Sequence, residues 1–384
     1  MASRKSKVVD VHTHMYPPEY ISILTSRSTI PLVRTFPSQQ QDDSKPQDPR
    51  LILLEAEIPS LQLALSDPSA PIPGRPLTSH YASLSQKIHF MDTHQIDISV
   101  ISLANPWLDF LTPEEASGPL PAKINQDFER MCTLHPGRLF FFATLPLTAP
   151  SADVILKSIE SSKELKHCRG VIMGTSGLGR GLDDPNLLPV FEALAQHNLP
   201  VFLHPHYGLP NSVYGPQQEN YGHVLPLALG FPMETTIAVA RMYLAGVFDA
   251  VPGLRMILAH SGGTLPFLAG RIESCVLHDG VLLKKFKEEK RRTVWEVLRE
   301  QVYLDAVVYN EVGLKAAIGA SGEDRLMFGT DHPFFPPLET DEQGEWESVG
   351  LNAQAVRKAL GEGSEGAEGV MGGNAVRVLK LVEE

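Results

Sequence analysis

Short apolar runs recur along the chain, and most of them contain a polar residue at the end or are followed by a polar residue or a proline. The first run covers residues 8–14 and ends in the pair His12 and His14 on either side of a threonine. Seven further runs of similar length follow, at residues 98–104, 138–145, 170–174, 199–206, 255–260, 302–306 and 325–331. Strands that are apolar along nearly their whole length are typical of a parallel sheet buried on both faces. The pattern therefore predicts eight strands in one parallel sheet.

The segments between these runs have the apolar spacing of helices. Leu84, Ile88 and Met91, for example, fall on one face of a helix. Helical patterns occur at residues 84–96, 124–135, 187–197, 232–248, 294–301, 355–360 and 375–381, and others begin at residues 151, 264 and 311. Eight strands that alternate with helices match a (β/α)8 TIM barrel of the α/β class. An open, doubly wound sheet is the alternative.

Two connections are longer than a barrel needs. One follows the first strand, at residues 16–79, and the other follows the fifth strand, at residues 207–231. Within the first, residues 51–65 have a helical pattern, whereas the proline-rich residues 68–76 predict irregular structure. Because long connections are often lids or walls of a site, we expect the 16–79 insertion to form part of one.

Composition narrows the class of protein. No internal repeat or linker divides the 384 residues, so we expect one domain, 1–384, that closes with a helical segment at 340–384. The hydrophobic fraction of 43% suits a sizeable core. A formal net charge of −12 disfavours nucleic acid or an anionic membrane as the main partner. Three cysteines without a CxxC pair, and no signal-like or membrane-length apolar run, favour a cytoplasmic enzyme with reduced thiols.

Polar side chains gather at the ends of the predicted strands. Residues two apart in a strand face the same way, so His12 and His14 point to one side. Other polar residues end or follow later strands: Asn105, His204, His206, His260, Asp331 and His332. In a barrel, the carboxyl ends of all strands open on the face where active sites lie. With only 14 histidines in the chain, this concentration indicates a site, although His206 is interpreted as a loop histidine.

Imidazoles and a carboxylate on this face favour a site for a divalent ion. We predict His12, His14, His204 and Asp331 as the ligands, because three neutral imidazoles and one carboxylate suit a first-row metal and leave room for substrate. His260 precedes a pair of glycines and a predicted helix. It is a candidate for orienting the substrate or exchanging protons.

Two motifs at the later strand ends are distinctive. They read His-Ser-Gly-Gly-Thr-Leu-Pro-Phe at 260–267 and Phe-Gly-Thr-Asp-His-Pro at 328–333. Together with the histidine pair of the first strand, they resemble the aminocarboxymuconate-semialdehyde decarboxylase group of the amidohydrolase superfamily. Four further segments are similar to the fungal isoorotate (uracil-5-carboxylate) decarboxylases of thymidine salvage, at residues 74–77, 102–107, 204–210 and 331–335. The similarity covers essentially the whole barrel.

This resemblance implies a particular site. It implies zinc at His12, His14, His204 and Asp331. Nitrogen and oxygen ligands also accept manganese, which is the alternative metal. No lysine motif for a pyridoxal cofactor is evident, so we expect no organic cofactor. The resemblance places substrate contacts on Arg75, Asn105, His260 and Phe334. The predicted fourth strand lacks the lysine that binuclear superfamily members carry, so we expect one metal ion per chain. The resemblance also implies a homodimer or homotetramer.

The activity implied is the non-oxidative decarboxylation of a small ring carboxylate, uracil-5-carboxylate, to uracil and CO2. Asp331 is the first candidate for the acid that protonates the ring carbon, and His260 is its rival. Arg75 suits a carboxylate, Asn105 an amide edge and Phe334 a flat ring. The alternatives are a hydroxybenzoate decarboxylase (2,3-dihydroxybenzoate, γ-resorcylate or salicylate type), a mononuclear metal-dependent hydrolase such as a lactonase, and a non-catalytic metal-binding protein.

Overall fold

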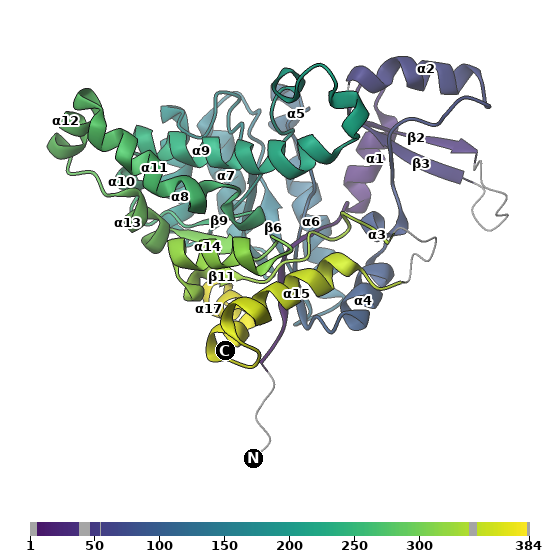
Figure 1. The fold of residues 1–384 in the computed structure, drawn as a ribbon. Coiled ribbons are helices and arrows are strands. Elements are labelled where there is room, and N and C mark those ends of the chain that lie inside the picture. Colours follow the sequence, from purple (N-terminus) through teal and green to yellow (C-terminus); the bar gives the residue numbers. More distant parts are fainter. Residues whose placement is uncertain (1–5, 38–46, 54, 338–343, 382–384) are drawn as a thin grey trace.

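Eight parallel strands form the main sheet of the protein (Figure 1). The computed structural model describes residues 6–37, 47–53, 55–337 and 344–381, so parts of the 16–79 and 340–384 segments lie outside the described residues. In spatial order the strands are β1 (Val9–His14), β5 (Ile98–Ser102), β6 (Leu139–Thr144), β7 (Cys168–Gly174), β8 (Val201–His204), β9 (Met256–Leu258), β10 (Val302–Asp305) and β11 (Leu326–Met327).

Backbone contacts between the first and last strand regions close this sheet. Thr13 forms a parallel bridge with His332, and the Val11 amide donates to the Phe328 carbonyl at 3.0 Å. Every strand between them pairs in parallel with its neighbour in sequence order. The predicted (β/α)8 barrel is therefore confirmed, and the open sheet is not the fold of this chain.

The strands are apolar because they are buried on both faces. Every residue of β1, β5, β6, β8, β9, β10 and β11 is buried. The last strand is shorter than the predicted run at 325–331. Strand pairing ends after Met327. The Thr330 amide (3.0 Å) and hydroxyl (2.8 Å) then donate hydrogen bonds to the Asp10 carboxylate. Asp331 then adopts a left-handed φ of 58°.

Helices surround the barrel strands (Figure 1). The longer ones are α4 (Leu84–Thr93), α6 (Leu120–Thr133), α7 (Ala152–Lys163), α8 (Leu188–Gln196), α9 (Phe231–Ala245), α11 (Leu265–His278), α12 (Gly280–Glu288), α13 (Val294–Glu300), α14 (Glu311–Ser321), α15 (Glu347–Leu360) and α17 (Asn374–Leu379). Short helices are α3 (Ser79–Ala82), α5 (Pro113–Ala116), α10 (Val247–Ala250) and α16 (Glu365–Glu368). The helix expected at 232–248 is divided into α9 and α10, because Gly246 adopts a left-handed φ of 89°.

The insertion after β1 is more regular than its sequence predicts. It contains α1 (Pro18–Ser26), α2 (Ile58–Ser66) and a three-stranded antiparallel sheet of β2 (Leu32–Pro37), β3 (Gln47–Ile52) and β4 (Arg75–Pro76). The helical prediction for 51–65 is wrong at its start, because Leu51 and Ile52 are buried in β3 and pair with β2. The prediction of irregular structure at 68–76 is wrong at its end, where Arg75 pairs with Leu51. A proline fits there because β4 is an edge strand.

The connection after β8 is built from short helical turns. It contains 3-10 turns at Asn211–Tyr214 and Gln218–Tyr221 and a π-helical turn at Pro226–Gly230, which leads directly into α9. Within the described ranges, no helix combines the length and the apolar character that crossing a bilayer requires.

Candidate metal centre and active site

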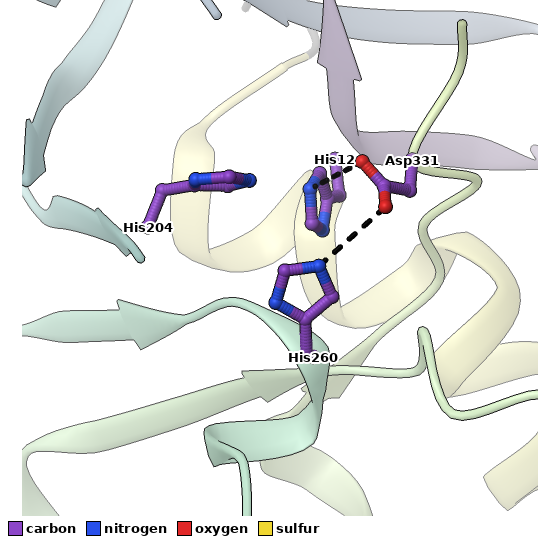
Figure 2. Close-up of side chains that lie close together, drawn as sticks. All are labelled: His12, His204, His260 and Asp331. Carbon is purple, nitrogen blue, oxygen red and sulfur yellow. Dashed lines mark ion pairs between the residues drawn. The ribbon is translucent and has the colours of Figure 1, made fainter. Parts of the chain in front are cut away.

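Four polar side chains meet at the carboxyl ends of the barrel strands. His12 lies in β1, His204 ends β8, His260 follows β9 and Asp331 follows β11. Their ligand atoms all lie within 4.8 Å of one another (Figure 2). No other group of three or more His, Cys, Asp or Glu side chains with metal-ligand spacing occurs in the described part of the chain. The structure thus gathers three of the four predicted metal ligands and adds His260.

His14 lies beside this group, but it is not among the four residues whose ligand atoms lie within 4.8 Å of one another. Its ring centroid is 5.1 Å from that of His12 and 5.0 Å from that of His204. Its Nε2 atom lies 3.6 Å from Oδ1 of Asp331. The same carboxylate approaches Nε2 of His12 at 3.2 Å and, through Oδ2, Nε2 of His260 at 3.5 Å. Asp331 is therefore the residue around which these imidazoles converge.

The imidazoles of His12, His14 and His204 are oriented through one ring nitrogen. Nδ1 of His12 contacts Oδ2 of Asp305 at 2.6 Å, Nδ1 of His14 contacts the Ser102 hydroxyl at 3.0 Å, and Nδ1 of His204 contacts the Pro205 carbonyl at 2.8 Å. The Nε2 atoms of all three are buried and make no hydrogen bond of regular geometry with a described residue, although those of His12 and His14 face the Asp331 carboxylate. Metal-binding histidines have this arrangement, in which one nitrogen is fixed and the other is left for the metal. The residues present therefore fit a divalent ion.

Burial and neighbouring charges set the protonation of the cluster. Burial alone lowers the pKa of His12, but the carboxylates of Asp331 and Asp305 outweigh it and raise the pKa to about 10. Burial lowers the pKa of His14 to about 4 and holds that of His204 well below its ordinary value. Burial raises the pKa of Asp331, but the charge on His12 and hydrogen bonds from the histidines outweigh it and hold the pKa well below its usual range. The site therefore contains an ionised carboxylate and two neutral imidazoles ready to bind a cation.

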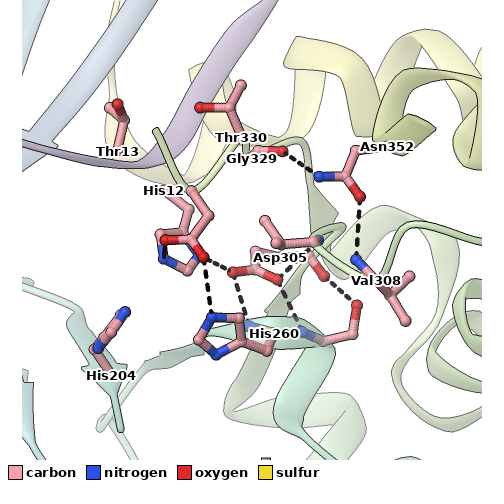
Figure 3. Close-up of polar contacts among 12 residues, drawn as sticks. His12, Thr13, His204, His260, Asp305, Val308, Gly329, Thr330 and Asn352 are labelled. Carbon is pink, nitrogen blue, oxygen red and sulfur yellow. Dashed lines mark hydrogen bonds and ion pairs between the residues drawn. The ribbon is translucent and has the colours of Figure 1, made fainter. Parts of the chain in front are cut away.

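Asp305 supports the site, and the sequence reasoning missed it. Oδ2 accepts hydrogen bonds from Nδ1 of His12 and from the His260 amide (3.0 Å). Oδ1 accepts from the amides of Ser261 (2.8 Å) and Val307 (3.0 Å) (Figure 3). One carboxylate thus fixes two histidines of the cluster. The signal was present, because Asp305 is a polar residue near the end of an apolar strand, like the residues that were singled out.

A second missed residue is Lys87, whose amine is fully buried behind the site. It donates to the Thr13 hydroxyl and lies 3.3 Å from Nδ1 of His332. Burial lowers the pKa of Lys87 to about 8. Thr13 lies between two predicted ligands and His332 follows Asp331, so the amine joins the two ends of the closed barrel. The signal was a lysine on the apolar face of its helix.

The predicted substrate residues lie in one wall beside the cluster. The Arg75 guanidinium is 5.3 Å from the ring centroid of Phe334, and its Nη2 atom donates to the Tyr16 hydroxyl at 3.5 Å. The Tyr16 hydroxyl donates in turn to the Asn105 carbonyl at 3.1 Å. The Asn105 side chain donates to the His206 carbonyl at 2.6 Å. The Phe334 amide donates to the Asp331 carbonyl at 2.8 Å. Within the described ranges, no side-chain hydrogen bond or ion pair joins Arg75, Asn105 or Phe334 to the four-residue cluster.

The two other strand-end histidines are engaged elsewhere. His206 contacts Asp109 through Nε2 at 2.9 Å and the Ser176 hydroxyl through Nδ1 at 3.1 Å. His332 contacts Lys87 through one nitrogen and His80 through the other, at 3.2 Å. Both rings therefore hold loops together, which agrees with the interpretation of His206 as a loop histidine.

Comparisons with known proteins agree with this architecture. A family model described as amidohydrolase matches residues 102–381. A 2-amino-3-carboxymuconate-6-semialdehyde decarboxylase from Dictyostelium discoideum is 26% identical over 310 residues, which cover 77% of this chain and 76% of that protein. The crystal structure of Metarhizium anisopliae IDCase in apo form superposes with a TM-score of 0.93 at 70% identity, covering 100% of this chain and 99% of that one.

A more distant structure supports the fold alone. It is the 5-carboxyvanillate decarboxylase of Novosphingobium aromaticivorans, complexed with manganese and a nitrobenzoic acid, with a TM-score of 0.71 and 19% identity over 99% of this chain and 97% of that one. The family match spans most of the barrel, including the segments that carry His204, His260 and Asp331. The chain therefore belongs to the amidohydrolase family, among its decarboxylases related to aminocarboxymuconate-semialdehyde decarboxylase.

Proposed function

We propose that this protein is a carboxy-lyase that converts uracil-5-carboxylate (isoorotate) to uracil and CO2 without oxidation, in thymidine salvage. The observation that carries the proposal is the full-length, 70% identity to Metarhizium anisopliae IDCase, an isoorotate decarboxylase, combined with the His–Asp cluster. The relatives that are named decarboxylases support the reaction class.

We propose one divalent ion, zinc, bound by His12, His14, His204 and Asp331. The buried Nε2 atoms of the three histidines, which make no hydrogen bond of regular geometry with a described residue, support this set. Nitrogen and oxygen ligands also accept manganese, which is the alternative metal. The ion, when bound, supplies Lewis acidity and a template for the carboxylate and a neighbouring ring oxygen. His260 is the alternative fourth ligand, because its side chain lies within the cluster and that of His14 lies at its edge.

The side chains around the cluster suggest how the substrate is held. Arg75 provides a planar guanidinium for a carboxylate or ring oxygen, and Phe334, which already faces this guanidinium, provides a flat apolar surface for the ring. Asn105 provides an amide for the polar edge of a pyrimidine. These groups would orient a flat, anionic ring with its carboxylate toward the cluster.

Asp331 and His260 form the proposed acid pair. Their side chains lie 3.5 Å apart, so a proton can pass between Nε2 of His260 and Oδ2 of Asp331. Asp331 is ionised in the free protein, so in the proposed step substrate binding raises its pKa and lets it hold this proton. Asp331 or His260 then gives the proton to the ring carbon that carries the carboxylate. The bond from that carbon to the carboxylate then breaks, its electron pair returns to the ring, and CO2 leaves. The acid, left as its conjugate base, takes up a proton from water.

A substrate panel tests the proposal. We expect the purified protein with zinc to convert uracil-5-carboxylate to uracil, followed by ultraviolet absorbance, much faster than it decarboxylates 2,3-dihydroxybenzoate or γ-resorcylate. Faster decarboxylation of a benzoate would overturn uracil-5-carboxylate as the substrate, but the protein would still be a decarboxylase. Activity on lactones alone would overturn the decarboxylase proposal.

We also propose a homodimer or homotetramer. Phe267 and Leu277 on α11 and Val281 on α12 are exposed large apolar side chains, which suit a contact between copies. The molecular mass in solution measures this directly.

A further inference from the structure

Tyr309 is held in an unusual backbone conformation beside the site. It follows β10 and has a φ of 58°, in the left-handed region that a residue with a bulky side chain rarely adopts. The amides of Val308 (3.2 Å) and Tyr309 (2.8 Å) both donate to Oδ1 of Asn352 in α15, and the contact to Val308 is seen in Figure 3. Asn352 also donates to the Gly329 carbonyl at 3.4 Å. The strained loop is therefore tied to the segment that leads to Asp331.

The Tyr309 hydroxyl is buried and has no hydrogen-bond partner among the described residues. A buried hydroxyl without a partner destabilises a protein, and most buried hydroxyls in proteins are paired. The hydroxyl of Tyr16, which lies among the predicted substrate residues, has such a partner in the Asn105 carbonyl. Tyr309 therefore combines a strained backbone with an unpaired hydroxyl. Because both features destabilise the free protein, they indicate that this conformation serves a function.

Tyr309 lies four residues after Asp305, the last residue of β10, whose carboxylate holds His12. Burial raises the pKa of Tyr309, and the negative charges of Asp331 and Asp305 raise it further. The hydroxyl is therefore a neutral donor at physiological pH. Its ring packs edge-on against Phe335, with ring centroids 5.8 Å apart, and Phe335 adjoins the ring of Phe334 at 5.9 Å. Tyr309 thus packs against the aromatic pair that includes Phe334, the side chain proposed for the substrate ring.

We propose that the Tyr309 hydroxyl binds the substrate, donating a hydrogen bond to an oxygen atom of the ring acid. This inference rests on the proposed function and adds a substrate contact to it. A ring carboxylate carries oxygen acceptors on its carboxylate and on the ring, and a neutral donor in the loop after β10, behind the aromatic pair, can reach such an acceptor. Binding then satisfies the hydroxyl that the free protein leaves unpaired.

The test is Tyr309→Phe, with Tyr303→Phe as the matched control. Tyr303 lies near the other end of β10, where its ring packs against the Arg325 guanidinium at 4.6 Å. Because the Tyr309 hydroxyl has no partner in the free protein, its removal should leave the melting temperature of the ligand-free protein unchanged or slightly raised. Its removal should also weaken substrate recognition, lowering kcat/KM about 10-fold or more. The loss of kcat/KM should not occur in Tyr303→Phe. Weaker binding of uracil by Tyr309→Phe, measured by calorimetry, would place the contact on a ring oxygen, and unchanged binding with a reduced kcat/KM would place it on the carboxylate, which uracil lacks.

The outcomes separate this inference from the proposed function. If the wild-type protein decarboxylates uracil-5-carboxylate and Tyr309→Phe has the same kcat/KM and the same affinity for uracil, the Tyr309 inference is overturned and the function stands. A clear loss of melting temperature in ligand-free Tyr309→Phe also overturns it, because the hydroxyl would then be paired without substrate. If the wild-type protein acts on no ring acid of the panel and binds none, the proposed function fails and the inference fails with it.

Discussion

At the scale of single residues, position at a strand end identifies most of the cluster. His12, His204 and Asp331 were found from the sequence because polar residues rarely end buried strands unless they have a role there. His14 shares the direction of His12, but its ring lies at the edge of the cluster. Asp305 was overlooked, although it ends an apolar strand, because it belongs to neither of the two distinctive motifs. The resemblance pointed to Arg75 and Phe334, and the structure brings these two together.

Replacing Asp305 with asparagine should weaken metal binding. All four groups that contact its carboxylate are donors: Nδ1–H of His12 and the amides of His260, Ser261 and Val307. An amide nitrogen in place of either oxygen would face two of these donors. Because removal of such a supporting group typically costs about 10–100-fold in metal affinity, we expect a loss of this size in a chelator competition assay.

A suitable control is Asp97→Asn, which changes a surface carboxylate that accepts from the Val8 amide at 2.8 Å. This variant should bind zinc as the wild-type protein does. Equal zinc affinity in Asp305→Asn and wild type would show that Asp305 does not orient His12.

At the scale of elements, the barrel was predictable and the insertion was not. The barrel strands are apolar along their length because helices cover one face and the barrel core the other. In the small sheet, β2 and β3 have mixed burial, and β4 has only two residues. Their pairing depends on contacts between residues far apart in the sequence, such as Leu51 with Arg75, which local periodicity cannot reveal. The same limit explains why β11 was predicted too long.

The turn between β9 and α11 requires glycine. Gly263 has a left-handed φ of 67°, and a Cβ atom there would lie 2.1 Å from the Pro232 carbonyl oxygen. We therefore expect Gly263→Ala to destabilise the protein by about 1–3 kcal/mol or more, measured by urea unfolding, because it combines strain with a backbone clash. Gly280→Ala is the control: nothing lies within 4 Å of the added Cβ at this first residue of α12. Equal stability of the two variants would contradict this account of the turn.

At the scale of the whole molecule, the contacts that close the barrel also bring the site residues together. The metal ligands proposed in β1 and after β11 come from opposite ends of the sequence and meet only because the first and last strands are joined. Asp10, Thr330 and Lys87 reinforce the same closure from behind. An ion bound by His12 and Asp331 would therefore connect both ends of the barrel, and activity should depend on it directly.

The most direct test of this account is turnover of uracil-5-carboxylate during metal reconstitution. The metal-stripped protein should be inactive, and activity should rise in proportion to added zinc and saturate near one equivalent per chain. Asp331→Ala should stay inactive at any zinc concentration. Full activity after complete removal of the metal, or near-normal turnover by Asp331→Ala, would contradict the central claim that this cluster holds the ion and carries out the decarboxylation.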